Sequence, residues 1–396
     1  MKRPDLLVAG GGPAGSVLAL LAARAGLRVR LVDRDRFPRD KVCGEFLSAE
    51  GCAVLRRAGL LDELAAAGGV PMESCVLTDL AGKPLRLALP ELRGGGRSAL
   101  GISRRHLDAF LLQRAAEAGA DVRTETDVRG PLLEHGRVAG LRVRGRAARG
   151  DGEALRATVV VAADGRRSAL GRGLDGGAQD PWRTTPASWF GLRTHLPVSG
   201  IRAEPAVELH LFCAGYAGIA PVEGDRLNLC LLVRVGALRA CGGSPARLLA
   251  ERLVRQPALR ERLGPRPETA GWCAVGPLRF NTRRTSAAGA LFVGDAAGTV
   301  DPFCGEGMSN ALAGAELLAP HVVRAVRDGA VDREVEAAWA RDWRRAFAGA
   351  ARRGRLLGGL LQRPRLAAAL LALLRGPARG LAPRLVAASR TAAAVR

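Results

Sequence analysis

Residues 6–15 read Leu-Leu-Val-Ala-Gly-Gly-Gly-Pro-Ala-Gly, and Asp33 follows eighteen positions after the last of these glycines. The apolar residues predict a buried strand, and the glycines predict a tight turn into a helix, which leads to a second strand ending at Asp33. Gly10 permits the turn, Gly12 lets the backbone approach a pyrophosphate, and Gly15 lets the helix pack closely on the strand. The free N–H groups at the start of the helix favour phosphate oxygens. This unit predicts a dinucleotide site in which Asp33 accepts a hydrogen bond from a ribose hydroxyl.

The composition limits the classes of protein that fit this chain. Its 396 residues suffice for two or three domains, and its 48% hydrophobic and 25% charged residues are ordinary for a globular protein. The net charge is +22, but only three of the 60 basic residues are lysine, and the chain has one Tyr and five Trp. This indicates a compositional bias towards arginine rather than a base-stacking surface, so we expect no nucleic-acid partner.

Other features of the sequence bear on location and on metals. The chain enters its first strand directly after residue 5, which leaves no room for a signal peptide. No apolar run reaches the roughly 18 residues that a membrane-spanning helix needs, so we expect a cytoplasmic protein. The eight cysteines include no C-x-x-C pair, so we expect neither a metal site nor a disulfide framework.

The order of the predicted elements divides the chain into parts. The sequence predicts a strand hairpin over 74–89, an amphipathic helix capped by Ser103 over 103–119, alternating strands over 186–235 and a helix over 244–263. We therefore expect a discontinuous dinucleotide-binding domain (1–70, 98–182 and 276–330), an inserted, mainly β substrate domain (71–97 and 183–275) and a basic helical C-terminal segment (331–396).

Three later segments each end a predicted strand or open a helix at a polar or glycine-rich turn. Residues 159–168 contain a buried strand that ends in Asp-Gly at 164–165, and residues 291–298 contain one that ends in Gly-Asp at 294–295. Residues 302–312 form a Pro/Gly loop that opens a helix. Ligands bind at the carboxyl ends of the strands in open α/β sheets, so these segments are candidate parts of one site.

In this order, the glycine turn and the three later segments resemble the FAD-dependent oxidoreductases of the aromatic-hydroxylase fold. This family, the group A flavoprotein monooxygenases, includes a geranylgeranyl-reductase-like branch, and the resemblance covers about residues 1–330. It implies an α/β fold with a discontinuous, GR2-type Rossmann-like FAD-binding domain, an inserted, mainly antiparallel β-sheet substrate domain and a helical C-terminal segment. It also implies FAD as the cofactor. Because no second Gly-x-Gly-x-x-Gly unit is present, either NADH or NADPH is a transient electron donor, as we expect, or the electrons come from another protein.

The resemblance also implies which residues contact the cofactor. They are Gly10, Gly12, Pro13, Ala14, Gly15, Asp33, Arg34, Arg104, Val128, Asp164, Gly294, Asp295, Pro302, Gly305, Gly307 and Met308. The glycines at 10, 12 and 15 and Arg104 would lie at the FAD pyrophosphate, Asp33 at the adenosine ribose and Val128 at the adenine. Asp164 would serve both FAD and the pyridine nucleotide, and Asp295 the ribitol chain. The loop 302–307 would wrap the isoalloxazine, at which the helix from near Met308 would direct its positive end.

The resemblance leaves two chemistries open. Residues 43–45, Cys-Gly-Glu, look like a segment near the flavin in geranylgeranyl-reductase-like proteins, and the triplet recurs at 304–306. The Tyr-x-Trp-x-Phe-Pro segment common in prenyl reductases is reduced to Tyr216 and Pro221, and residues 188–192 do not match the halogenase motif Trp-x-Trp-x-Ile-Pro. These departures favour a monooxygenase that uses NAD(P)H and O2 on an apolar aromatic, polyketide-like or lipid-like molecule. The alternative is saturation of C=C bonds in a prenyl or polyene substrate. A third is a non-catalytic basic protein that binds membranes or nucleic acid.

No residue stands out as a catalytic acid or base. Cys43, Tyr216 and Cys304 are candidates for contact with flavin or substrate, whereas His195 and His210 qualify by residue type alone. One hypothesis is that Cys43 and Cys304 face each other across the isoalloxazine and tune, or exchange with, the reduced flavin. The alternative is that both are small residues that allow close backbone approach.

The C-terminal segment combines leucine runs with arginine. Residues 341–396 hold thirteen Arg and one acidic residue, Asp342. This pattern predicts basic amphipathic helices that either lie peripherally on an anionic membrane surface or cap the two main domains. Both interpretations stay open, and the oligomeric state is not predicted.

Overall fold

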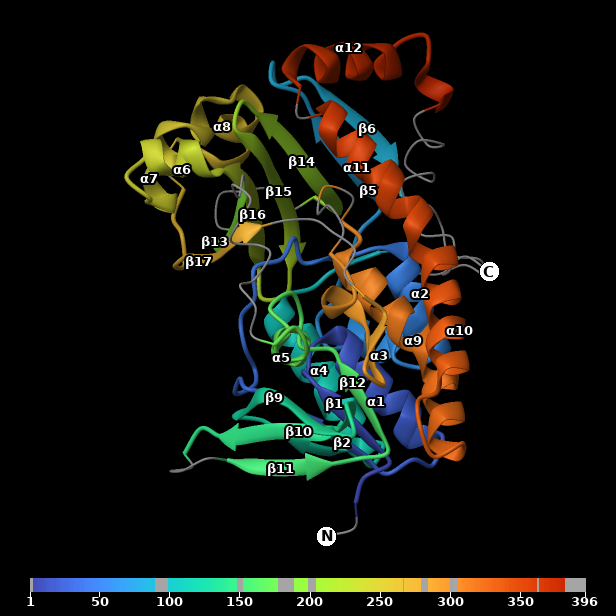
Figure 1. Ribbon diagram of the computed structural model, residues 1–396. Coiled ribbons are helices and arrows are strands. Elements are labelled where there is room, and N and C mark those ends of the chain that lie inside the picture. The colour runs from blue at the N-terminus through green and yellow to red at the C-terminus, as the bar shows by residue number, and fades with distance from the viewer. Residues whose placement is uncertain are drawn as a thin grey trace.

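The computed structural model describes residues 3–89, 99–147, 152–176, 189–198, 204–265, 267–278, 284–299, 303, 305–361 and 363–381. A six-stranded sheet lies in the lower half of the view in Figure 1 and contains β1 (Leu6–Ala9), β2 (Val29–Val32), β8 (Asp121–Arg123), β12 (Val159–Ala162), β18 (Ser286–Ala287) and β19 (Ala290–Phe292). The strand order is β18-β19-β12-β1-β2-β8, and all neighbours are parallel except β18 and β19. The predicted open α/β sheet is confirmed.

Seven helices accompany this sheet in the described chain: α1 (Pro13–Arg24), α2 (Ala49–Arg57), α3 (Leu61–Ala66), α4 (Arg104–Glu117), α5 (Ala169–Leu174), α9 (Gly307–Arg327) and α10 (Arg333–Trp343). Ser103 caps α4 as predicted, because its side chain accepts a hydrogen bond from the His106 backbone N–H. A small sheet of β3 (Phe46–Leu47), β7 (Leu100–Gly101) and β4 (Val70–Pro71) lies beside them.

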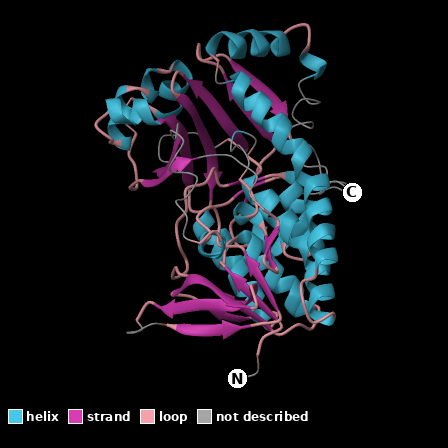
Figure 2. Cartoon of the chain, viewed as in Figure 1, coloured by secondary structure: helices cyan, strands magenta, loops and turns pink. Residues whose placement is uncertain are grey.

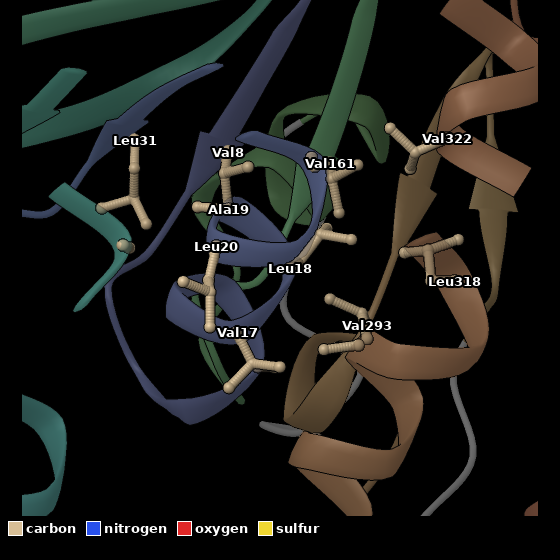
Figure 3. Packing of buried hydrophobic residues seen from close by; sticks show 14 of the residues in the cluster. Val8, Val17, Leu18, Ala19, Leu20, Leu31, Val161, Val293, Leu318 and Val322 are labelled. Atoms are coloured by element: carbon tan, nitrogen blue, oxygen red, sulfur yellow. The ribbon is translucent and has the colours of Figure 1, made fainter. Parts of the chain in front are cut away.

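The core of this part forms where α1 and α9 pack together beside the sheet. Leu18 of α1 lies beside Val161 of β12, Val17 comes from the same helix, and Val293 and Leu318 come from the chain around α9; all are buried (Figure 3). The sequence places α1 immediately after the first glycine turn and α9 immediately after the last loop. Packing of these two helices therefore brings together motifs almost 300 residues apart in sequence.

A second, seven-stranded sheet forms the upper half of the molecule (Figure 2). Its strands are β5 (Ser74–Thr78), β6 (Pro84–Ala88), β13 (Trp189–Pro197), β14 (Ala206–Phe212), β15 (Gly215–Val222), β16 (Arg226–Arg234) and β17 (Cys273–Leu278). The order is β17-β13-β16-β15-β14-β5-β6, and only β14 and β5 run parallel. Two segments inserted between strands of the first sheet, β5–β6 between β2 and β8 and β13–β17 between β12 and β18, thus join one mainly antiparallel sheet, as expected for an inserted domain.

Helices α6 (Val235–Ala240), α7 (Pro245–Glu251) and α8 (Pro257–Leu263) pack beside the seven-stranded sheet (Figure 1). The prediction of one helix over 244–263 was wrong. Pro257 starts α8 because it has no backbone N–H to continue the preceding turn, and the Gln256 side chain caps α8 by accepting from Leu259 N at 2.6 Å.

A three-stranded antiparallel sheet of β9 (Thr126–Glu134), β10 (Arg137–Gly145) and β11 (Glu153–Arg156) lies beside the first sheet (Figure 1). The domain boundaries stay predictions. Residues 276–278, which we assigned to the dinucleotide-binding domain, complete β17 of the seven-stranded sheet.

The C-terminal segment is mainly helical over its described residues up to 381, as predicted. A π-helical stretch at 344–348 joins α10 to α11 (Gly349–Leu361), and α12 (Pro364–Arg375) and a short 3₁₀ turn (Arg379–Leu381) follow. The helices α11 and α12 lie along β5 and β6 (Figure 1). Among the described residues, no single helix has the length and apolarity to cross a membrane. One bent helix pair, Arg333–Leu361 with Arg365–Arg375, meets the length and composition criteria together.

The helix α10 packs into the hydrophobic core beside the first sheet. Removing its buried Trp339 side chain should therefore destabilise the whole molecule. Trp339 is fully buried and its Nε1 donates to the Phe292 carbonyl at 3.1 Å. We expect Trp339→Ala to cost about 3–5 kcal/mol of unfolding free energy through the cavity left behind. We expect Trp339→Phe to cost about 1–3 kcal/mol, because the Phe292 carbonyl loses its donor. Urea unfolding measures both, and a cost below about 1 kcal/mol for the alanine variant would contradict the assignment.

Candidate functional site

A large cavity of about 1770 Å³ is lined by residues of both main sheets and of the C-terminal helices. It exceeds the roughly 300–1,000 Å³ of a pocket for one small ligand, so it has room for two. Most of the cofactor-binding residues expected from the sequence line it: Gly10, Gly12, Pro13, Ala14, Asp33, Arg34, Arg104, Val128, Asp164, Gly294, Asp295, Gly305, Gly307 and Met308. The structure therefore brings the four separate motifs to one place.

Of the expected residues that the structure describes, one does not line the cavity. Gly15 lies behind the turn, where a β-carbon would meet the Gly10 carbonyl oxygen at 1.9 Å, so its role is close packing of helix on strand. Pro302 lies outside the described residues, as does Cys304. The hypothesis that Cys43 and Cys304 face each other across a flavin is therefore still a prediction.

The glycine turn leaves an open face at the start of α1. Gly10 has a φ of +104°, and a β-carbon there would lie 2.4 Å from the Ala163 carbonyl oxygen, so the turn requires glycine. Gly12 is different, because a β-carbon there would meet nothing closer than the guanidinium groups of Arg39 and Arg104 at 3.8 Å. The space beyond Gly12 is therefore open and lies beside two cations and the positive end of a helix.

Arg39 and Arg104 converge on the buried carboxylate of Asp108. Arg104 donates to both oxygens of Asp108 at 2.7 Å, and Arg39 Nη1 lies 3.2 Å from Asp108 Oδ2. Burial alone would lower the pKa of Arg104, but the Asp108 charge raises it, so the guanidinium stays charged. Arg39 is buried near three carboxylates, with Nε 3.5 Å from Asp35 Oδ2, Nη1 3.2 Å from Asp108 Oδ2 and Nη2 3.7 Å from Asp33 Oδ2. Its Nε and Nη1 nevertheless complete no hydrogen bond among the described residues. Such donors fit an anionic ligand.

Asp33 does more than the sequence analysis assigned to it. Its Oδ2 accepts from Gly11 N at 2.6 Å and its Oδ1 from Asp35 N at 2.8 Å. The carboxylate therefore holds the glycine turn in place while it lines the cavity. Asp164 caps the start of α5, with Oδ2 accepting from Ala169 N at 2.7 Å. Burial raises the pKa of Asp164, and its Oδ1 has no partner in the described chain, so it can meet a polar group of a ligand.

The opposite part of the cavity is formed by the loop that precedes α9. This helix begins at Gly307 without a side-chain cap, so its first N–H groups and its positive dipole end are available to a ligand. Phe303 of this loop meets Tyr216 of β15 edge to face, with ring centroids 5.5 Å apart at 89°. Tyr216, a candidate from the sequence, thus lines the cavity at the boundary between the two domains.

The Cys43–Glu45 turn is fixed by a buried polar cluster that the sequence analysis missed. Glu45 Oε1 accepts from Arg104 N at 3.0 Å, and Glu45 Oε2 lies 2.7 Å from His195 Nε2. Arg193 Nη1, which can only donate, lies 3.2 Å from His195 Nδ1, so the Nε2 of His195 carries the proton and donates to Glu45. Glu45 is fully buried with a φ of +54°, a conformation that these hydrogen bonds stabilise.

This cluster joins the two domains. His195 belongs to β13, and Asn228 of the neighbouring β16 donates to the Cys43 carbonyl at 3.0 Å. His195 is therefore a structural partner of Glu45, and it does not line the cavity in the described structure. Sequence reasoning could not find the pair, because the two residues are 150 positions apart.

His210 lies away from the cavity. It pairs with Glu208 at 3.0 Å, and Arg262 of α8 contacts the same carboxylate at 2.6 Å. Val207 and Leu209, the alternate residues of β14, line the cavity instead. His210 therefore lies on the face of the sheet that packs against α8, opposite the cavity. No catalytic role follows from this position.

Four of the seven described cysteines line the cavity, and all seven are free thiols. The four on its wall are Cys43, Cys75, Cys230 and Cys273. Burial raises the pKa of the Cys43 thiol, although the nearby Arg104 charge lowers it in part. The thiol is therefore protonated at neutral pH. No group of three His, Cys, Asp or Glu side chains able to hold a metal occurs among the described residues.

The far end of the cavity is apolar. Its wall on the seven-stranded sheet comes from alternate residues of several strands, among them Leu77, Leu85, Leu87, Leu209, Tyr216 and Leu232. The opposite wall comes from α11 and α12 through Leu357, Leu361, Leu370, Leu371 and Leu374. The same sheet face carries Arg193, His195 and Asn228 near the Cys43–Glu45 turn, so its polarity falls steadily towards α12.

A dinucleotide-binding turn that opens into an apolar cavity between two sheets is the arrangement of a flavoprotein oxidoreductase. Residues 3–351 match the family described as FAD binding domain, and the chain belongs to this family. The protein is an FAD-dependent oxidoreductase. NADH or NADPH is the typical electron donor of the family.

Alignments with similar proteins cover most of the chain. It is 31% and 32% identical to digeranylgeranylglycerophospholipid reductases 2 and 1 of Methanopyrus kandleri, over 78% and 82% of this chain and 74% and 81% of those proteins. It is 30% identical to the menaquinone reductase of Mycolicibacterium smegmatis, over 78% of this chain and 74% of that protein.

Solved structures share the fold. The flavin-dependent brominase Bmp2 matches with a TM-score of 0.80 and 19% identity, over 98% of this chain and 94% of that one. A geranylgeranyl bacteriochlorophyll reductase-like protein of Thermoplasma acidophilum matches with a TM-score of 0.74 and 22% identity, over 92% of this chain and 88% of that one. PqsL of Pseudomonas aeruginosa, described as a probable FAD-dependent monooxygenase, matches with a TM-score of 0.77 and 21% identity, over 94% of this chain and 100% of that one.

The residues present fit FAD. The open face of Gly12, the unsatisfied donors of Arg39 and the charged Arg104 suit a pyrophosphate, and the uncapped start of α9 suits the electron-rich edge of a flavin. We propose that Gly12, Arg39 and Arg104 hold the pyrophosphate and that residues 305–308 hold the isoalloxazine. When bound, FAD supplies two-electron transfer between a nicotinamide and the substrate.

Proposed function

We propose that the protein reduces C=C bonds in a long, apolar chain of the prenyl or polyene type. The observation that carries this proposal is the apolar end of the cavity, where leucines from the sheet and from α11 and α12 face each other. Leucine walls on both sides suit a flexible aliphatic chain, which needs contact along its length and few hydrogen bonds. The named activities of the relatives above 30% identity, reductases of a prenylated phospholipid, support the same substrate class.

The net reaction adds two hydrogens across one double bond. NAD(P)H provides a hydride equivalent, the solvent provides one proton, and NAD(P)+ and the saturated C–C bond result. The chain's own residues bind and orient the two molecules. The Cys43–Glu45 turn, held by Arg104, His195 and Asn228, closes the polar end, and the leucine walls exclude water from the other end.

Hydroxylation with O2 is the second candidate function. It is favoured by residues 215–221, Gly-Tyr-Ala-Gly-Ile-Ala-Pro, which keep only the Tyr and the Pro of the aromatic-rich segment common in prenyl reductases. The Tyr216–Phe303 pair also offers an edge-to-face partner for an aromatic ring of a substrate. The two reactions differ in their need for oxygen, which makes them separable by experiment.

Substrate-dependent oxidation of NAD(P)H with and without oxygen tests the proposal. With a geranylgeranyl-bearing phospholipid in detergent, we expect NAD(P)H consumption to continue at an unchanged rate under anaerobic conditions, because the double bond accepts the electrons. The control omits the lipid and should show only the slow background rate. Consumption that requires both lipid and O2 would instead identify a monooxygenase.

A further inference from the structure

The exposed leucines are concentrated in the C-terminal helices among the residues that the structure describes. Among the described residues, five large apolar side chains are strongly exposed. Four of them lie on α11, α12 and the turn that follows: Leu356 (71% exposed), Leu366 (42%), Leu373 (48%) and Leu381 (49%). Leu133 of β9 (48%) is the fifth and lies at the other end of the molecule. We call the first four the outer leucines.

The helix α12 is apolar on all sides. Its sequence from 364 to 375 is Pro-Arg-Leu-Ala-Ala-Ala-Leu-Leu-Ala-Leu-Leu-Arg, with arginine near each end and none between. Ala367, Leu371 and Leu374 are buried against the sheet, whereas Leu366 and Leu373 point outward with three exposed alanines, 368, 369 and 372. A helix that is hydrophobic all round is usually enclosed, yet this one lies at the edge of the molecule (Figure 1). Its outer face therefore fits an apolar partner.

The charge around the outer leucines is positive. Residues 343–381 contain nine arginines and no Asp or Glu. Arg363 and Arg365 at the start of α12 and Arg379 after its end are exposed, so basic groups flank the apolar face at both ends. Apolar side chains bordered by arginine match the acyl boundary and the headgroups of an anionic bilayer.

The same helix separates this surface from the cavity. Leu370, Leu371 and Leu374 line the cavity from inside, and Arg375 fixes the end of α12 to the β5–β6 turn. Arg375 Nη2 lies 2.8 Å from Asp79 Oδ2, and Arg375 also donates to the carbonyls of Lys83 and Pro84. One helix layer thus stands between the outer leucines and the apolar end of the cavity.

We infer that the outer leucines and the flanking arginines dock the protein on an anionic lipid bilayer, with α12 lying in the interface. The inference rests on the proposed function, because a long apolar chain resides in a bilayer and would enter the cavity beside α12. Of the two interpretations left open by the sequence, α11 and α12 thus combine both: their inner face caps the domains and their outer face meets lipid.

Vesicle flotation of the full-length holoenzyme tests the inference. We expect binding to vesicles of phosphatidylcholine with phosphatidylglycerol and little binding to phosphatidylcholine alone. The double variant Leu366→Gln/Leu373→Gln should bind the anionic vesicles about tenfold or more weakly, because neither side chain can then enter the apolar layer. Leu133→Gln removes an equally exposed leucine from the opposite end and should bind like the wild type. Unchanged thermal unfolding shows that each variant is folded.

The test separates the inference from the proposed function. Turnover of detergent-dispersed lipid should be the same in the double variant and the wild type, since Leu366 and Leu373 do not line the cavity. If the wild type binds no vesicles, or if the double variant and Leu133→Gln lose binding equally, the docking surface is wrong. If vesicle binding behaves as expected while no lipid is reduced, the docking surface stands and the proposed function fails.

Discussion

Replacing Gly12 with alanine should give a folded protein that has lost most of its affinity for FAD. A β-carbon at Gly12 meets no protein atom closer than 3.8 Å, and its φ of −77° suits any residue, so the fold has no reason to change. The new methyl group fills the open face where a pyrophosphate would approach the first N–H groups of α1. Loss of charge-assisted hydrogen bonds there costs about 1.5–3 kcal/mol, or roughly 10- to 100-fold in affinity.

The affinity is measured by titrating FAD into the apoprotein and following flavin fluorescence, with thermal unfolding as the test of folding. Gly236→Ala is the matched control, because Gly236 lies in the first turn of α6, in the other domain, and has no atom within 4 Å of its β-carbon position. We expect this control to bind FAD like the wild type. Wild-type affinity in Gly12→Ala would contradict the assignment of the phosphate site.

Filling the apolar end of the cavity should abolish most activity on a long chain and leave the flavin site intact. Gly218 of β15 lines the cavity, and a β-carbon there would make only ordinary contacts, the nearest at 3.7 Å to the Cys230 carbonyl oxygen. A leucine side chain at this position must therefore extend into the cavity. We expect Gly218→Leu to lower kcat/KM for a geranylgeranyl lipid by about tenfold or more, since overpacking costs about 1–3 kcal/mol.

Two controls accompany this variant: the FAD content of purified Gly218→Leu, and the activity of a second variant, Gly236→Leu, at the surface of α6. Both should match the wild type. NAD(P)H oxidation with a short, water-soluble acceptor should also be retained, because such a molecule does not need the apolar end. An equal loss with long and short acceptors would mean that Gly218 affects the flavin site rather than the chain-binding end.

Much of the fold could be predicted because its decisive signals are local. The glycine turn at 10–15, the Asp-Gly and Gly-Asp strand ends and the α9 loop each combine a special backbone requirement with a buried strand or a helix start. The fold class, FAD and the oxidoreductase class are confirmed. Helix α4 with its Ser103 cap was also predicted correctly, since a cap is read from three or four adjacent residues.

The buried polar contacts of Glu45 and Arg39 could not be predicted from the sequence, because their partners are distant in the chain. Glu45 and His195 are 150 residues apart, and Arg39 gains significance only beside Arg104 and Gly12. A lone Arg in a loop or a lone His in a strand carries no local signal. The same reason explains why His195 and His210 could be named only by residue type, although each is buried beside a glutamate within hydrogen-bond distance.

The C-terminal segment shows a different limit. Its leucines and arginines predict amphipathic helices, but the periodicity does not tell which side meets the protein. The structure shows that Leu371 and Leu374 face the sheet and that Leu366 and Leu373 face outward. Only tertiary packing distinguishes these pairs, because α12 is apolar around its whole circumference.

The mass of the product tests most directly whether this protein saturates double bonds of a long apolar chain, as we propose. The enzyme, NADPH and a geranylgeranyl-bearing phospholipid are incubated without oxygen, and the lipid is analysed by mass spectrometry. The account predicts a gain of two hydrogens for each double bond reduced, in the absence of O2. An unchanged lipid without oxygen, together with incorporation of one ¹⁸O atom when ¹⁸O2 is supplied, would contradict it and identify a monooxygenase.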